Sequence, residues 1–149
     1  MTRAQEPQRG ERMPDHADAR VSRGMAARRA VLGDEHVDAA IGRTTDLDRP
    51  FQDYIVGAAW ADVWDRPGLD RATRSLITLS LLAALGHEHE LEMHLRATRR
   101  TGATPEQITE ALLHVAVYAG VPAANIAFAA MKRVLGAEGT VHDGVDAPR

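Results

Sequence analysis

Three histidines and three glutamates lie close together in the segment GHEHELEMHLRATRR, residues 86–100. At about 100° per residue of α-helix, Glu90 and His94 fall within roughly 40° of each other. Leu91 and Leu95 share that side of the helix. A carboxylate beside an imidazole on a partly apolar face has the surroundings that perturb a pKa. The spacing therefore indicates a positioned acid or base, with a hydrogen-bonded pair at a helix edge as the plain alternative.

A metal site is a second interpretation of the same segment, because His87, Glu90 and His94 share a face and offer nitrogen and oxygen ligands. The string from His89 to His94 is H-E-x-x-x-H rather than the H-E-x-x-H of zinc proteases, and its two histidines point about 140° apart. We therefore expect no metal ion. His89 falls on the polar side and is expected to be solvated, while His87 is left undecided.

Arginines are the candidate groups for binding an anion, since a planar guanidinium pairs with a carboxylate through two hydrogen bonds. Arg29 precedes an apolar stretch, and Arg74 lies on the flank of a helix otherwise made for burial. A further set of charges falls on the polar side of the helix that carries His94 and is expected to face solvent: Glu88, Glu92, Arg96, Arg99 and Arg100.

Two more polar side chains, His114 and Tyr118, lie four residues apart on the next expected helix. For His114 we favour a satisfied polar group of the core. Tyr118 lies just before Gly120, so its hydroxyl could enter a pocket at the end of the helix, or it could be a core residue like its neighbour.

Composition excludes several classes of function. The chain has no cysteine, which rules out disulfides, thiolate nucleophiles and cysteine-ligated metal centres. Its net charge of −3 is small and the signs are interspersed, unlike the basic surface of a nucleic-acid-binding protein. The first 20 residues are charged and lack the apolar stretch of a signal peptide, and the apolar run at 76–85 is too short to cross a bilayer. We expect a cytoplasmic protein with no nucleic-acid or membrane partner.

The elements that must position these residues are all helical. Thr104, Pro105 and Gln107 form an N-cap, a first-turn proline and a capping-box partner, and Asp70 begins another helix in the same way. Helices are expected near 22–32, 34–44, 50–64, 71–85, 88–101, 105–119 and 122–135, with no strand-like alternation. The fold class is therefore all-α, one compact domain of six to seven helices over residues 21–138, flanked by flexible tails at 1–20 and 139–149.

The expected helix at 71–85 is apolar around most of its circumference, and such a helix must be covered on all sides. A lone domain of this size would struggle to cover it, so we expect a homo-oligomer. Small residues in the last helix would allow close approach to a neighbour: Ala123, Ala124, Ala127, Ala129 and Ala130.

Four separated motifs together resemble the carboxymuconolactone decarboxylase family, with a match from about residue 24 to residue 135. They are RRAVLGDEHVD (28–38), FQDYIVGAAWADVWDRPGLDRATRSLITL (51–79), ELEMHLRA (90–97) and YAGVPAAN (118–125). The resemblance implies a helical fold like that of the alkylhydroperoxidase accessory proteins, assembled as a homo-oligomer and commonly a hexamer. The thiol branch of the family carries a Cys-x-x-Cys pair where this chain has His87 and Glu90, so peroxidase chemistry is excluded here.

The resemblance also implies a reaction, the loss of CO2 from the dicarboxylate lactone 4-carboxymuconolactone in protocatechuate breakdown, without a cofactor. His94 is then expected to donate a proton or stabilise an oxyanion, with Glu90 orienting it. The carboxylate-binding groups would be Arg74 and Arg29, with Tyr118 as a hydrogen-bond donor, and an apolar wall would include Trp60 and Trp64.

Two other functions are compatible with the same residues. One is a non-catalytic helical oligomer that binds a small acid or a partner protein through the arginines. The other is a decarboxylase of a related lactone or β-keto acid, because one pocket side chain can change specificity without disturbing the motifs.

Overall fold

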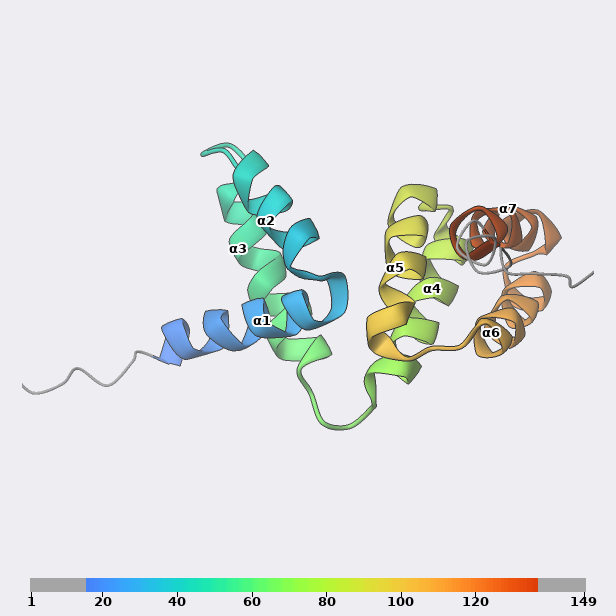
Figure 1. Ribbon diagram of the computed structural model, residues 1–149, viewed down its shortest axis with the longest axis horizontal. Coiled ribbons are helices and arrows are strands. Elements are labelled where there is room, and N and C mark those ends of the chain that lie inside the picture. The colour runs from blue at the N-terminus through green and yellow to red at the C-terminus, as the bar shows by residue number, and fades with distance from the viewer. Residues whose placement is uncertain (1–15, 137–149) are drawn as a thin grey trace, which may run out of the picture.

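The computed structural model describes residues 16–136, and every element in that range is helical (Figure 1). The elements are α1 (His16–Leu32), α2 (Asp34–Arg43), α3 (Arg49–Ile55), η1 (Val56–Trp64), α4 (Arg71–Leu85), α5 (Glu88–Thr101), α6 (Pro105–Tyr118), α7 (Val121–Met131) and η2 (Lys132–Gly136). The expected all-α class is confirmed, and each expected helix is present.

Two features of the helices differ from expectation. Helix α1 begins at His16 rather than near residue 22, so the part of the predicted N-terminal tail that the structure describes is helical. The rest of both predicted tails lies outside the described residues. The helices expected at 50–64 and 122–135 each end in a π-helical segment, η1 and η2, in which the backbone turn is wider.

The predicted helix starts are present in detail. The Asp70 carboxylate accepts a hydrogen bond of 2.7 Å from the backbone N–H of Thr73 at the start of α4. Thr104 and Gln107 form a reciprocal capping box at the start of α6, with hydrogen bonds of 3.0 and 3.3 Å. These caps satisfy backbone donors that the first turn of a helix leaves without partners, which is why such short motifs locate a helix end.

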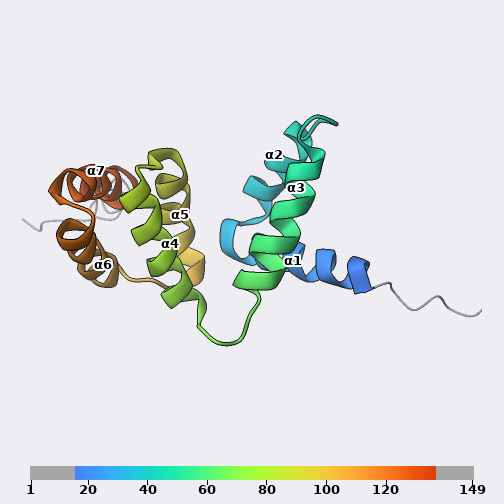
Figure 2. The same cartoon turned by 180° about the vertical axis from the view of Figure 1, so that it is seen from behind.

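The helices form two halves joined by the segment 65–70, as Figures 1 and 2 show from opposite sides. In the first half, α1 packs closely on η1. Gly24 makes this approach possible, because a Cβ atom there would lie 2.2 Å from the carbonyl oxygen of Val56. At the edge of the same contact, the Arg20 guanidinium donates to the Asp62 carboxylate.

The second half is an apolar core enclosed by α4, α5, α6 and α7. Its largest fully buried side chains are Leu79, Leu91, Leu95, Ile108 and Leu112. Three of the small residues of α7, Ala124, Ala127 and Ala130, are buried in this core. They bring α7 close to helices of its own chain, so at least these three do not form a contact surface for another subunit.

Helix α5 belongs to both halves. Leu91 and Leu95 point into the second core, whereas Ala97 and Met93 pack in a smaller cluster with Trp60 of the first half. His94 lies between these two faces of α5 and is buried where the halves meet.

The outer face of α4 is apolar and open. Ile77, Leu81 and Leu85, spaced four residues apart, are 46%, 57% and 67% exposed, while Leu79 on the inner face is fully buried. Within residues 16–136, no helix combines the length and the apolar character that a membrane span requires.

Candidate functional site

His94 lies at the end of a column of three aromatic rings, formed with Trp64 and Trp60, which we call the His94 column. Its imidazole stacks on Trp64 with ring centroids 5.9 Å apart and planes 12° from parallel, and Trp64 in turn stacks on Trp60 at 5.4 Å. The π-helical turn of η1 carries both tryptophans, with the backbone N–H of Asp65 donating to the Trp60 carbonyl at 3.0 Å. Three of the residues predicted for the site are thus brought together from two distant segments.

Burial keeps the His94 imidazole neutral at neutral pH. The side chain is only 7% exposed, and this loss of solvent lowers the pKa of His94 to about 4. A nearby imidazole, that of His36, lowers the pKa further, while the negative charge of Glu90 opposes the shift. The buried Nδ1 atom has no hydrogen-bond partner among the described residues. His94 therefore offers an uncharged ring with an unused polar atom.

Glu90 is more open than its position on the helix suggested. It lies one turn before His94 and is exposed, and no hydrogen bond between the two side chains is formed in the described part of the chain. Its influence on His94 is electrostatic, through the pKa.

The two arginines predicted to bind carboxylates already have partners of their own. Arg29 donates hydrogen bonds of 3.0 Å to Asp34 and 2.6 Å to Asp38, which raise the pKa of the guanidinium. Arg74 donates to the backbone carbonyl of Arg66 at 2.8 Å, and its buried Nε atom has no hydrogen-bond partner within residues 16–136. Neither arginine forms a hydrogen bond or ion pair with His94 or Glu90.

Tyr118 and the remaining histidines lie outside the aromatic column. Tyr118 is 84% exposed and stacks on His114 of the same helix, with ring centroids 6.1 Å apart. The interpretation of His114 as a core residue is wrong, because its side chain is exposed. The expectation that His89 is solvated is confirmed, and His87 is exposed as well. Among residues 16–136, no three potential ligand side chains converge as a metal site would require.

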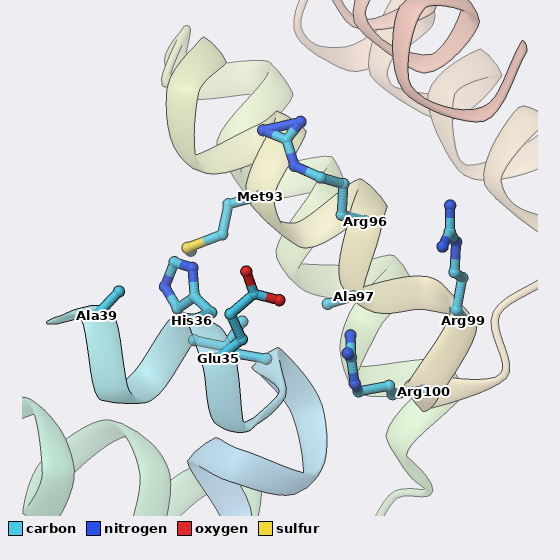
Figure 3. A pocket seen from close by; sticks show the side chains of 9 residues that line it. Glu35, His36, Ala39, Met93, Arg96, Ala97, Arg99 and Arg100 are labelled. Atoms are coloured by element: carbon cyan, nitrogen blue, oxygen red, sulfur yellow. The ribbon is translucent and has the colours of Figure 1, made fainter. Parts of the chain in front are cut away.

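A cleft of about 570 Å³ lies between α2 and α5, next to the His94 column (Figure 3). Helix α2 contributes Glu35 and His36 to one wall, and α5 supplies three arginines to the other. We call it the α2–α5 cleft; its lining residues are Leu32, Glu35, His36, Ala39, Met93, Arg96, Ala97, Arg99 and Arg100. These arginines are exposed, as expected from the sequence, and they also line a cleft because α2 lies across from them.

His36 connects the cleft with the aromatic column. Its side chain is half-buried and lines the cleft, and it is close enough to His94 to lower the pKa of that imidazole. Burial lowers the pKa of His36, and the positive charges of Arg28, Arg43 and Arg96 lower it further. The sequence did contain a signal for this residue, since His36 stands inside the RRAVLGDEHVD motif.

Comparison with known proteins gives consistent matches. The model of the carboxymuconolactone decarboxylase family matches residues 49–133. The 4-carboxymuconolactone decarboxylase of Acinetobacter baylyi is 46% identical over 110 residues, which cover 74% of this chain and 82% of that protein. The nitrosuccinic acid decarboxylase of Metarhizium robertsii is 40% identical over 123 residues, covering 83% of this chain and 82% of that protein.

Proposed function

The chain belongs to the carboxymuconolactone decarboxylase family, and on that premise we propose that it is a carboxy-lyase that removes CO2 from 4-carboxymuconolactone. The product is the enol-lactone of 3-oxoadipate. The observation that carries the proposal is the buried, neutral His94 at the meeting of the two halves, in a chain 46% identical to a decarboxylase of that name.

The substrate supplies its own electron sink. The bond between the ring γ-carbon and its carboxylate breaks, and the electron pair moves through the ring double bond to the carbonyl oxygen of the lactone. A furan-like oxyanion results, and a proton then adds to the α-carbon. The protein has to hold two carboxylates, stabilise the transient oxyanion and return the proton, so no external electron acceptor enters the scheme.

His94 is suited to stabilising the oxyanion. A neutral imidazole can donate an N–H hydrogen bond to a developing negative charge, and it does so most effectively where water is excluded. With its pKa lowered to about 4, His94 is a poor source of an acidic proton at neutral pH. Of the two roles expected from the sequence, we therefore favour the hydrogen-bond donor.

Glu90 keeps the orienting role expected from the sequence, because its exposed carboxylate lies one helical turn from His94 and acts on that imidazole electrostatically. The proton that returns to the α-carbon then comes from solvent on the exposed side of the site. Trp64 and Trp60 hold the imidazole and shield it from water. Arg29, Arg74 and Tyr118 stay predicted substrate contacts.

A related acid is the second candidate substrate. The 40% identical relative is named for nitrosuccinic acid, which like carboxymuconolactone carries two carboxyl groups. In both molecules the carboxylate that departs can leave its electrons in a neighbouring acceptor, a nitro group or an unsaturated lactone. The shared requirement is a small dicarboxylate with a built-in electron sink.

We further propose that the chain acts as a homo-oligomer. The open face of α4, with Ile77, Leu81 and Leu85, is an apolar surface that a second copy would cover. Sedimentation at concentrations from nanomolar to micromolar would measure the subunit number, which the family resemblance puts at six. The cytoplasmic location stays a prediction.

Ultraviolet spectroscopy with freshly generated 4-carboxymuconolactone tests the activity. The proposal expects catalytic consumption of the lactone by the wild-type chain, and a loss of about 10²–10⁴ in kcat for His94→Gln. His89→Gln is the matched control, because that imidazole is exposed on the same helix. Stoichiometric binding without turnover would support the non-catalytic binder instead. Near-wild-type turnover by a folded His94→Gln variant would remove His94 from the mechanism.

A further inference from the structure

The side chains that line the α2–α5 cleft carry more positive than negative charge. Arg96, Arg99 and Arg100 line it, against one carboxylate, that of Glu35. His36 adds no charge at neutral pH, because burial first and neighbouring arginines second lower its pKa, but its ring still offers an N–H donor. The lining therefore favours an anion over a neutral or cationic ligand.

Two of these arginines keep hydrogen-bond donors for a ligand. In the described part of the chain, Arg96 forms one ion pair, with Glu92, and the 3.6 Å between nitrogen and oxygen is too long for a hydrogen bond. Arg100 forms no ion pair with any residue in 16–136. By contrast, Arg29 and Arg133 each donate hydrogen bonds to two carboxylates.

The position of Arg100 depends on a glycine. A Cβ atom at Gly33 would lie 2.6 Å from Nη2 of Arg100, so the guanidinium rests against the bare backbone between α1 and α2. The backbone of Gly33 also has φ +89°, a conformation that other residues rarely adopt. The sequence thus leaves room at this point for a guanidinium to lie in the cleft.

The floor of the cleft is apolar and is continuous with the wall of the His94 column. Met93 and Ala97 line the cleft and also pack in the cluster that includes Trp60 and Trp64. His36 lines the cleft and acts electrostatically on His94. A ligand on this floor would have its charged end at the arginines and its ring toward the imidazoles. Figure 3 shows the arginines and His36 on facing elements.

We propose that the α2–α5 cleft is the carboxylate-binding subsite of this protein, with Arg96 and Arg100 binding the carboxylates of a small dicarboxylate over the apolar floor. The identification of that dicarboxylate as the lactone substrate rests on the proposed function. The volume of about 570 Å³ lies within the usual range for small-molecule sites. Guanidinium–carboxylate pairing explains how a chain whose Arg29 is occupied by aspartates still holds a doubly charged substrate.

Titration calorimetry with maleate, a non-reactive dicarboxylate, tests the subsite without turnover. Arg96→Gln and Arg100→Gln should each weaken binding about tenfold or more, as loss of a charge-assisted hydrogen bond does. Glu35→Gln should tighten binding, because it removes the competing carboxylate. Lys132→Gln, which removes an exposed positive charge on η2, is the matched control and should leave affinity unchanged.

Kinetics with the lactone separates this proposal from the proposed function. If the cleft binds substrate, the arginine variants raise KM with a smaller change in kcat, whereas His94→Gln lowers kcat. Wild-type turnover with unchanged KM in the Arg96→Gln/Arg100→Gln double variant would overturn the subsite and leave the function standing. Arginine-dependent maleate binding without turnover of the lactone would support the subsite and contradict the proposed function. A wild-type chain that neither binds maleate nor consumes the lactone contradicts both.

Discussion

The His94 column and the α2–α5 cleft lie on neighbouring sides of one helix and differ in hydration and in charge. The column is enclosed, stacked on two tryptophans, and holds an imidazole that burial keeps neutral. The cleft is open and its arginines are exposed, with more positive than negative charge along its walls. Helix α5 supplies groups to both.

This difference follows from the cost of removing charge from water. An imidazole can be buried at modest cost because it loses its proton, whereas a guanidinium stays charged and needs solvent or a counter-ion. Groups that hold an anionic substrate therefore belong at the open side. A group that acts on charge developed during the reaction is most effective at the enclosed side.

The largest expected effect on the free energy of unfolding comes from the His94 column. Trp60 is 6% exposed and supports Trp64 under the imidazole, so Trp60→Ala should lower the free energy of unfolding by about 3–5 kcal/mol. Urea denaturation followed by circular dichroism measures the change. Trp60→Phe keeps an aromatic ring and should cost less. A loss below about 1 kcal/mol for the alanine variant would show that the column is not well packed.

Acid should destabilise the protein through His94. Its pKa is about 6.5 in an unfolded chain and about 4 when folded, so between these values the unfolded state binds the proton more readily. Stability is therefore complete above pH 6.5 and falls by about 3 kcal/mol as pH drops toward 4. His36 has a pKa lowered in the same direction. Denaturation of wild type and His94→Gln at pH 7.5 and 4.5 isolates the contribution of His94, and equal slopes would contradict it.

Gly33, at the edge of the cleft, should show an intermediate effect. Gly33→Ala puts a Cβ on a backbone with φ +89° and against the Arg100 guanidinium, so we expect a loss of about 1–2 kcal/mol together with a higher KM. Gly42→Ala is the matched control, because that glycine lies in α2 with open space around it. The control should be neutral or slightly stabilising. Equal behaviour of the two variants would mean that Gly33 is not needed to position Arg100.

Local signals explain why the fold could be predicted from sequence. The caps at Asp70 and Thr104 and the spacing of apolar residues act within one or two helical turns, and they located the starts of α4 and α6 correctly. The π-helical turn of η1 could not be found in this way. Over nine residues, an apolar stripe fits a slightly wider helix as well as an ordinary one.

The sequence predicts the position of a site residue only where the pattern of a single helix determines it. The pattern of α5 itself places His94 on an apolar face, and the structure buries it. The same pattern assigned Arg96 and Arg100 to solvent, because nothing local shows that α2 lies opposite them. The contacts of His36 and Trp64 with this region likewise join segments far apart in the chain, which a single sequence does not reveal.

The smallest expected effect is that of a cleft arginine on the free energy of unfolding. It tests most sharply whether the α2–α5 cleft and the His94 column have different roles. Arg100→Gln should change the free energy of unfolding by no more than about 0.5 kcal/mol, since an exposed side chain without an ion pair contributes little to folding. Its effect should appear in KM and in the salt dependence of KM, because ions screen an exposed guanidinium. Urea denaturation and kinetics at low and high salt measure both quantities. A cost above about 1.5 kcal/mol with unaltered KM would make Arg100 a structural residue, and the distinction between a binding side and a reacting side of α5 would then fail.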